Sequence, residues 1–129
     1  MIGLKKIDKR GEAIPGLLTL QVERPWGYFR QFCENSPVTV KLIVVKPNKI
    51  LSLQSHAKRS EFWRVLEGSG QAEIDGKMQS LKIEDELIVP VKAKHRLRAG
   101  INGLEVLEIS FGEFTENDII RYEDKYGRI

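Results

Sequence analysis

The sequence predicts an all-β protein folded as a jelly-roll barrel. Its apolar residues occur in many short runs separated by Gly, Pro, Asn and Asp, which favour turns. No long stretch repeats its apolar residues at the period of about 3.6 that marks an amphipathic helix. Many short strands joined by tight turns are typical of jelly rolls and barrels. The chain of 129 residues has room for one domain, so we expect a single domain over residues 1–129, with residues 1–16 as an N-terminal arm.

Turn residues set the limits of the expected strands. Asp75-Gly76 between two short apolar runs predicts a two-residue hairpin of type I′. Pro25 and Gly27 end the first strand, and Trp26 between them either stacks on a sugar ring or closes one end of the core. Outside the metal-site region described below, we expect strands at residues 17–22, 28–33, 38–45, 71–74, 77–81 and 104–111. Thr115 and Asp118 have the spacing of a helix capping box, which predicts a short helical turn after the last long strand.

Composition and charge limit the kinds of molecule that the chain is expected to bind. The chain is 41% hydrophobic and 30% charged, with a net charge of +3, which suits an anionic substrate but fits solvated lysines equally well. Nucleic-acid binding would need a clustered basic face. One row of cations alternates with His95 and Leu97, so it faces away from them. The row consists of Lys92, Lys94, Arg96 and Arg98. We therefore expect no nucleic-acid partner.

The chain carries no feature that predicts export or membrane insertion. Cys33 is the only cysteine, so an intrachain disulfide is impossible and a reducing compartment is permitted. The first residues contain no apolar run of signal-peptide length, and nowhere do about eighteen apolar residues occur together. We expect a cytoplasmic protein with no membrane partner.

A candidate metal site lies in residues 51–68 and at His95. Gln54 and His56 are two positions apart, so on a strand both side chains leave the same face, and Glu61 follows a break that can fold the chain back. His95 is the only other histidine. Two imidazoles with oxygen ligands suit one divalent transition metal and leave positions for water or substrate. We expect zinc first, with Mn, Co, Fe and Ni also open.

Three further positions carry charges that a barrel interior could use. Lys41 is the lone cation of VTVKLIVV (residues 38–45), so it either extends from a sheet edge into solvent or lies in a cavity. Glu105 and Glu108 leave opposite faces of one strand, and the inward one should be paired and used, since a buried unpaired carboxylate is costly. Arg121 suits a phosphate or an enediolate oxygen, or pairs with a neighbouring acid.

Several segments resemble one known family. The spacing of Gln54, His56, Glu61 and Gly68 resembles the first cupin motif with Gln in place of its first His, and Pro90 to His95 resembles the second. In family order, over about residues 20–128, the chain is similar to the cupin domain of type II mannose-6-phosphate isomerases. The similar segments are ERPWG (23–27), VKLIVVKP (40–47), SLQSH (52–56), RSEFW (59–63), IVP with HRL (88–97) and NDIIRYEDKYGR (117–128).

The chain departs from this family at three positions. It has Phe62 where His is usual, Lys92 where Gly is usual in the second motif, and Asn48 where Gly is usual in a turn. Asn tolerates a left-handed backbone, so Asn48 costs little. Phe62 alternates with Glu61 and should point away from the metal, affecting packing more than chemistry. Bifunctional relatives carry a nucleotidyltransferase domain ahead of the cupin, and we expect a stand-alone cupin here.

The resemblance implies an isomerase that interconverts mannose 6-phosphate and fructose 6-phosphate through a cis-enediol. It implies a metal on Gln54, His56, Glu61 and His95 that orients the sugar oxygens. Type I relatives carry a lysine shortly before their metal strand, which favours Lys41 in the cavity. The spacing of a glutamate in those relatives favours Glu105 as proton shuttle, with Glu108 as the alternate.

The resemblance also implies how the phosphorylated sugar is held and how the chain assembles. Lys41 and Arg121 would neutralise its oxyanion or phosphate. Cupins commonly pair through edge strands, and an exposed VTVKLIVV strand would be a liability, so we expect a homodimer.

Two rival functions stay open. A metal-bearing, sugar-binding cupin without catalysis would bind metal and ligand without turnover, which Phe62 and Lys92 permit. A small iron-dependent dioxygenase would consume oxygen, but it gives the ERPWG and YEDKYGR segments no role.

Overall fold

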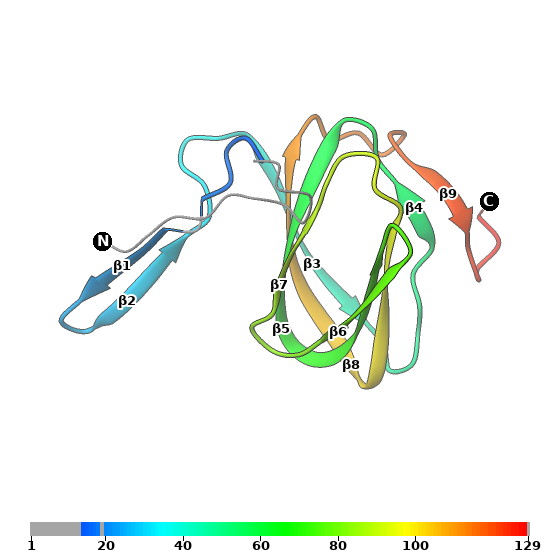
Figure 1. Cartoon of the computed structure of the whole chain (residues 1–129), viewed down its shortest axis with the longest axis horizontal. Coiled ribbons are helices and arrows are strands. Elements are labelled where there is room, and N and C mark those ends of the chain that lie inside the picture. Colours follow the sequence, from blue (N-terminus) through cyan, green and yellow to red (C-terminus); the bar gives the residue numbers. More distant parts are fainter. Residues whose placement is uncertain (1–13, 19, 129) are drawn as a thin grey trace.

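The protein is an all-β barrel with a projecting hairpin (Figure 1). A computed structural model describes residues 14–18 and 20–128, and these form nine strands and no helix. The strands are β1 Leu20–Arg24, β2 Gly27–Gln31, β3 Val38–Val45, β4 Leu53–Ser55, β5 Arg59–Ile74, β6 Lys77–Leu81, β7 Glu86–Val89, β8 His95–Gly112 and β9 Ile120–Glu123. The main sheet has the order β6-β5-β8-β4-β9, with β3 on β8 and β7 on β5. No helix in this part of the chain could span a membrane.

Two long strands carry the barrel. β5 and β8 pair antiparallel from Arg59 with Gly112 to Ile74 with His95. The pair bends where its register shifts between Gly68 and Gly70. A Cβ on Gly68 would lie 2.1 Å from the Gly103 carbonyl oxygen, so only glycine permits this approach. The bend curves the β5–β8 strand pair, so residues from the two ends of this pair lie close to one another inside the barrel.

The barrel interior is filled by an apolar cluster to which most strands contribute. Val65, Leu97 and Val106 are each at most 2% exposed and belong to it. On β5 the inward side chains alternate with Phe62, which is buried in a second cluster with Leu17 and Phe111. The prediction that Phe62 points away from the metal ligands into packing is therefore confirmed.

The hairpin β1–β2 forms its own two-stranded sheet and projects from the barrel (Figure 1). Trp26 at its turn is 72% exposed, so the prediction that it closes the core is wrong for the described residues. An ion pair links the hairpin to the barrel, since Arg30 Nη1 lies 2.7 Å from Glu86 Oε2. The first strand begins later than predicted because Leu17 packs into the second cluster instead. Residues 1–13 of the expected arm lie outside the described residues.

Local turn chemistry follows the sequence closely. Asp75 and Gly76 have φ of 49° and 81°, as the type I′ prediction requires. Asn48 takes φ 62° and Lys92 takes φ 66°, so both stand in left-handed positions that suit glycine. The predicted helical turn after β8 is only a turn, closed by the Asp118 N–H donating to the Thr115 carbonyl at 3.1 Å.

β3 presents two different faces. Lys41 is opposite Glu108 of β8, so both side chains lie on the inner face. Val40, Leu42 and Val44 lie on the other face and are 56%, 58% and 62% exposed. Within the described chain β3 pairs only with β8, so it is an edge strand.

Candidate metal centre

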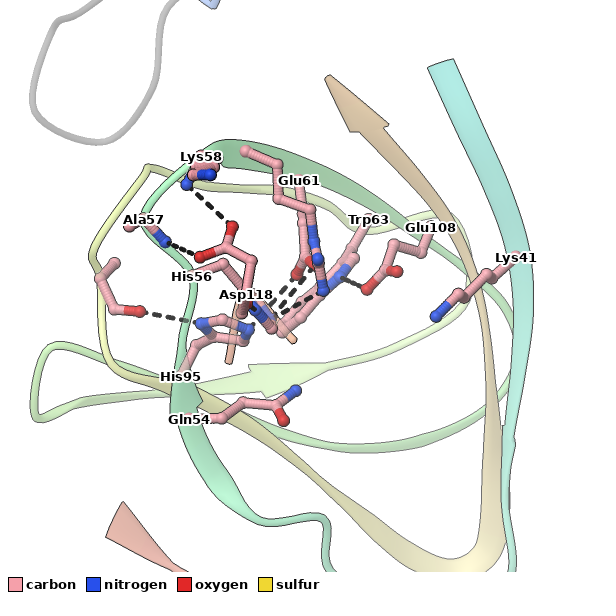
Figure 2. A network of polar contacts seen from close by, with 12 residues as sticks. Lys41, Gln54, His56, Ala57, Lys58, Glu61, Trp63, His95, Glu108 and Asp118 are labelled. Carbon is pink, nitrogen blue, oxygen red and sulfur yellow. Dashed lines mark hydrogen bonds and ion pairs between the residues drawn. The ribbon is translucent and has the colours of Figure 1, made fainter. Parts of the chain in front are cut away.

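Two imidazoles and one carboxylate converge in the barrel interior. His56 lies just beyond β4, Glu61 lies on β5 and His95 begins β8, and all three are at most 4% exposed. Their potential ligand atoms lie within 4.8 Å of one another (Figure 2). The Glu61 carboxylate is between the rings, 3.6 Å from His56 Nε2 and 3.3 Å from His95 Nε2. Three of the four ligands predicted from sequence are thus brought together.

Backbone carbonyls fix the orientation of both imidazoles. His56 Nδ1 lies 2.7 Å from the Asp118 carbonyl oxygen, and His95 Nδ1 lies 2.9 Å from that of Ala93. A carbonyl only accepts, so each Nδ1 carries the hydrogen. Each Nε2 faces the Glu61 carboxylate, and in the neutral ring it carries the lone pair. This is the tautomer that ligates a metal through Nε2.

The residues fit a divalent ion. Glu61 Oε1 and His95 Nε2 are buried 3.3 Å apart, and among the described residues neither has a hydrogen-bond partner other than this contact. A metal bound to both atoms would satisfy them when His95 is neutral. Two imidazole nitrogens and a carboxylate oxygen form a donor set that zinc and other divalent transition metals accept.

The protonation states suit metal binding. Burial alone would raise the pKa of Glu61, but His95, His56 and Arg59 outweigh it and lower the pKa to about 2. Burial lowers the pKa of His56, which keeps this ring neutral. Burial also opposes charge on His95, but the nearby Glu61 carboxylate outweighs it and raises the pKa of His95. Where His95 carries a proton on Nε2 beside the ionised Glu61 carboxylate, a metal would replace that proton.

Arg59 is part of the site, although the sequence analysis did not single it out. It is 7% exposed, with Nε 3.3 Å from Glu61 Oε2 and Nη2 3.2 Å from His56 Nε2. Its guanidinium lies 4.3 Å from the centre of the Phe114 ring. The signal was available, because Arg59 is two positions before Glu61 on one strand and so shares its face.

Gln54 is adjacent to the cluster. It is opposite His95 of β8 and Arg121 of β9 in the register, so the three residues share one face of the sheet. Its side-chain oxygen accepts a hydrogen bond from the Ser52 hydroxyl at 3.2 Å. Gln54 as the fourth metal ligand remains a prediction.

The inward glutamate is Glu108 and not the predicted Glu105. Glu108 is 6% exposed and accepts a hydrogen bond from Trp63 Nε1 at 3.0 Å, whereas Glu105 pairs with Val44 and Glu67 on the outer side of the barrel. The cause is the register shift at the bend of β8, which changes the inward phase of the strand between its two halves. Glu105 shares the phase of His95 by sequence count, but the bend reverses it.

Glu108 carries a proton near neutral pH. Burial, followed by repulsion from ionised Glu61, raises the pKa of Glu108 to about 7. Glu61 holds a charge at pH 7, whereas Glu108 is about half protonated at pH 7 and becomes the neutral acid of the pair at lower pH.

The two predicted cations lie near this interior. Lys41 faces Glu108, with a side chain 41% exposed and Nζ 4.5 Å from the Phe114 ring centre (Figure 2). Arg121 Nε is buried with no hydrogen-bond partner in the described chain. Its alternative partners are engaged elsewhere, since Glu123 pairs with Arg96 and Asp124 pairs with Arg128. Their part in binding remains a prediction.

Solved structures support the fold. Oxalate decarboxylase from Bacillus subtilis aligns with a TM-score of 0.62 and 22% identity over 67% of this chain and 24% of its own. A cupin protein from Bacteroides fragilis aligns with a TM-score of 0.55 and 21% identity over 63% of this chain and 74% of its own. At such identities the likeness shows the cupin fold alone. The same holds for a salicylate 1,2-dioxygenase at 18% identity, so the dioxygenase alternative gains no support.

The curated relatives are longer proteins than this chain. Mannose-1-phosphate guanylyltransferase from Escherichia coli is 39% identical over 110 residues, which is 84% of this chain and 23% of the relative. Alginate biosynthesis protein AlgA from Pseudomonas syringae is 40% identical over 111 residues, again 84% of this chain and 23% of the relative. The chain thus spans about a quarter of the length of the curated relatives it matches.

These relatives correct the functional prediction. They are named for guanylyl transfer to mannose 1-phosphate or for alginate biosynthesis, and not for isomerisation. The prediction that this chain interconverts mannose 6-phosphate and fructose 6-phosphate is therefore wrong. The prediction of the cupin fold and family is confirmed. The family profile described as "Mannose-6-phosphate isomerase C-terminal" matches residues 17–124, and the chain belongs to this family of cupin domains.

Proposed function

We propose that this chain is a metal-binding cupin that holds one divalent ion on His56, Glu61 and His95 and binds a phosphorylated mannose against it. The observation that carries the proposal is that two imidazole nitrogens and an oxygen of a buried carboxylate lie within 4.8 Å of one another. Zinc is the first candidate for the ion, and the Gln54 amide oxygen is a candidate for a further ligand. The names of the curated relatives favour mannose 1-phosphate as the sugar.

The ion would act as a Lewis acid that binds hydroxyl oxygens of the sugar. Neutral Glu108, on the same inner face as Glu61, would donate a hydrogen bond to a sugar oxygen. Trp63 holds one of its carboxyl oxygens at 3.0 Å and so orients the group. A neutral donor next to an anion favours a polar, uncharged ligand atom at this position.

Lys41 and Arg121 are the proposed phosphate ligands. Arg121 has a buried Nε without a partner in the described chain, and a phosphate oxygen would satisfy it. Lys41 lies on the strand opposite Glu108, and its Nζ now pairs with exposed Glu116 at 3.8 Å. It would exchange this partner for the phosphate, so the two cations would contact the phosphate from two sides. The net charge of +3 is consistent with an anionic ligand.

Calorimetric titration of mannose 1-phosphate into the protein tests this function. Protein stripped of metal with a chelator is compared with protein reloaded with Zn²⁺, and free mannose and inorganic phosphate serve as comparison ligands. We expect binding only in the loaded protein and loss of binding in His95→Ala. Arg121→Gln should weaken binding about tenfold, because a hydrogen bond to a charged group contributes roughly 1.5–3 kcal/mol.

Glu105→Gln is the matched control, because Glu105 lies on the outer face of the same strand as Glu108. It should bind as the unsubstituted protein does. Equal binding of mannose 1-phosphate with and without metal would contradict the proposal.

A further inference from the structure

Asp118 makes three contacts with three consecutive residues at the metal centre. Its carboxylate accepts hydrogen bonds from the Ala57 N–H at 2.9 Å and the Lys58 N–H at 2.9 Å. Its backbone carbonyl accepts the His56 Nδ1 hydrogen at 2.7 Å (Figure 2). Asp118 belongs to residues 113–119, which connect β8 to β9 and which we call the C-terminal connector.

These contacts have different roles. The carboxylate bonds fix where the connector lies, because two amides on adjacent residues hold both oxygens of one side chain. The carbonyl bond then fixes the tautomer and the orientation of His56. The carbonyl has the correct position only while the carboxylate holds the connector against residues 57 and 58.

We propose that Asp118 is a positioning residue of the metal centre: its carboxylate docks the C-terminal connector, and its carbonyl thereby holds His56 Nε2 toward the ion. This rests on the proposed metal-binding function. Groups that hold a ligating histidine from behind typically contribute a factor of about 10–100 to metal affinity. The coupling is reciprocal: the free energy by which the docked connector strengthens metal binding equals the free energy by which bound metal strengthens docking of the connector.

Zinc affinity of Asp118 variants tests the proposal. Asp118→Ala removes both carboxylate bonds, and we expect its zinc affinity to fall about 10–100-fold in competition with a chelator. Asp118→Asn keeps one acceptor oxygen but sets an NH₂ group against the second amide, so its affinity should be intermediate. If Asp118→Ala does not fold, the milder Asp118→Asn variant provides the measurement instead.

Asp124→Asn is the matched control on the same part of the chain. The Asp124 carboxylate accepts bonds from the Tyr126 and Arg128 N–H groups at 3.3 and 2.7 Å and contacts no candidate metal ligand. We expect its zinc affinity to match that of the unsubstituted protein. Equal losses in Asp118→Ala and Asp124→Asn would mean general destabilisation and would overturn the proposal.

Nitrogen-15 NMR of the metal-free protein gives a readout independent of metal. In the unsubstituted protein His56 should carry its hydrogen on Nδ1, a tautomer that the Arg59 guanidinium 3.2 Å from Nε2 also favours. In Asp118→Ala the Nδ1 resonance should shift, because the connector carbonyl no longer holds its hydrogen. An unchanged Nδ1 resonance in Asp118→Ala, together with unchanged zinc affinity, would refute the positioning role. Failure of the unsubstituted protein to bind zinc would refute the proposed function instead, while the nitrogen-15 measurement would still test Asp118.

Discussion

Replacing Glu108 with Gln should stabilise the metal-free protein at high pH. The pKa of Glu108 is about 7 in the folded chain against an ordinary value of 4.5. The folded state therefore binds the proton more tightly than the unfolded state, and the free energy of unfolding falls as the pH rises from about 4.5 through about 7. The full difference corresponds to about 3 kcal/mol, which is an upper estimate for a buried group beside another carboxyl. Gln stays neutral throughout and its side-chain oxygen can still accept from Trp63.

Urea unfolding at pH 5 and pH 8, in the presence of a chelator, measures this effect. We expect Glu108→Gln and the unsubstituted protein to be similar at pH 5. At pH 8 the Gln variant should be more stable by up to about 3 kcal/mol. Glu105→Gln on the outer face should change stability by less than about 0.5 kcal/mol at both values. If Glu108→Gln gave no advantage at pH 8, the buried neutral acid would be refuted.

Three further outcomes can be measured. Lys92→Gly should raise the free energy of unfolding by about 1 kcal/mol, because Lys92 has φ 66° and glycine adopts this region without strain. Urea unfolding measures the change, and an unchanged or lower free energy of unfolding would contradict this prediction. Zinc affinity should rise as the pH increases above about 6.5, because the raised pKa of His95 means that a proton must leave when the metal binds. Titration in buffers of different ionisation enthalpy should detect the released proton, and no release would argue against this exchange. Leu42→Lys should dissociate the predicted homodimer, because Leu42 is 58% exposed on edge strand β3. Light scattering measures the mass in solution, and an unchanged mass would count against this edge as the dimer interface.

The barrel and most of the ligand set could be predicted from local patterns. Gln54, His56 and Glu61 lie within one short region, so strand alternation and a single turn suffice to bring them to one face. Phe62 was placed correctly for the same reason. His95 was found because the chain holds only two histidines.

The errors arise where a local pattern depends on distant geometry. The spacing of a glutamate in type I relatives favoured Glu105, but the bend of β8 near Gly103 changes the inward phase of the strand, so Glu108 points inside. That bend exists because β8 curls together with β5, which no short stretch of sequence reveals. Asp118 was predicted to cap a helical turn, whereas its carboxylate binds amides about sixty residues earlier in the chain.

The central claim is that His56, Glu61 and His95 hold one divalent ion. The most direct test is the zinc content of chelator-stripped protein after reloading and removal of free metal, measured by mass spectrometry together with a thermal melt. We predict one zinc ion per chain with a raised melting temperature, and neither in His56→Ala or His95→Ala variants that remain folded. Zinc uptake unchanged in those folded variants, or no uptake by the unsubstituted protein, would contradict the account.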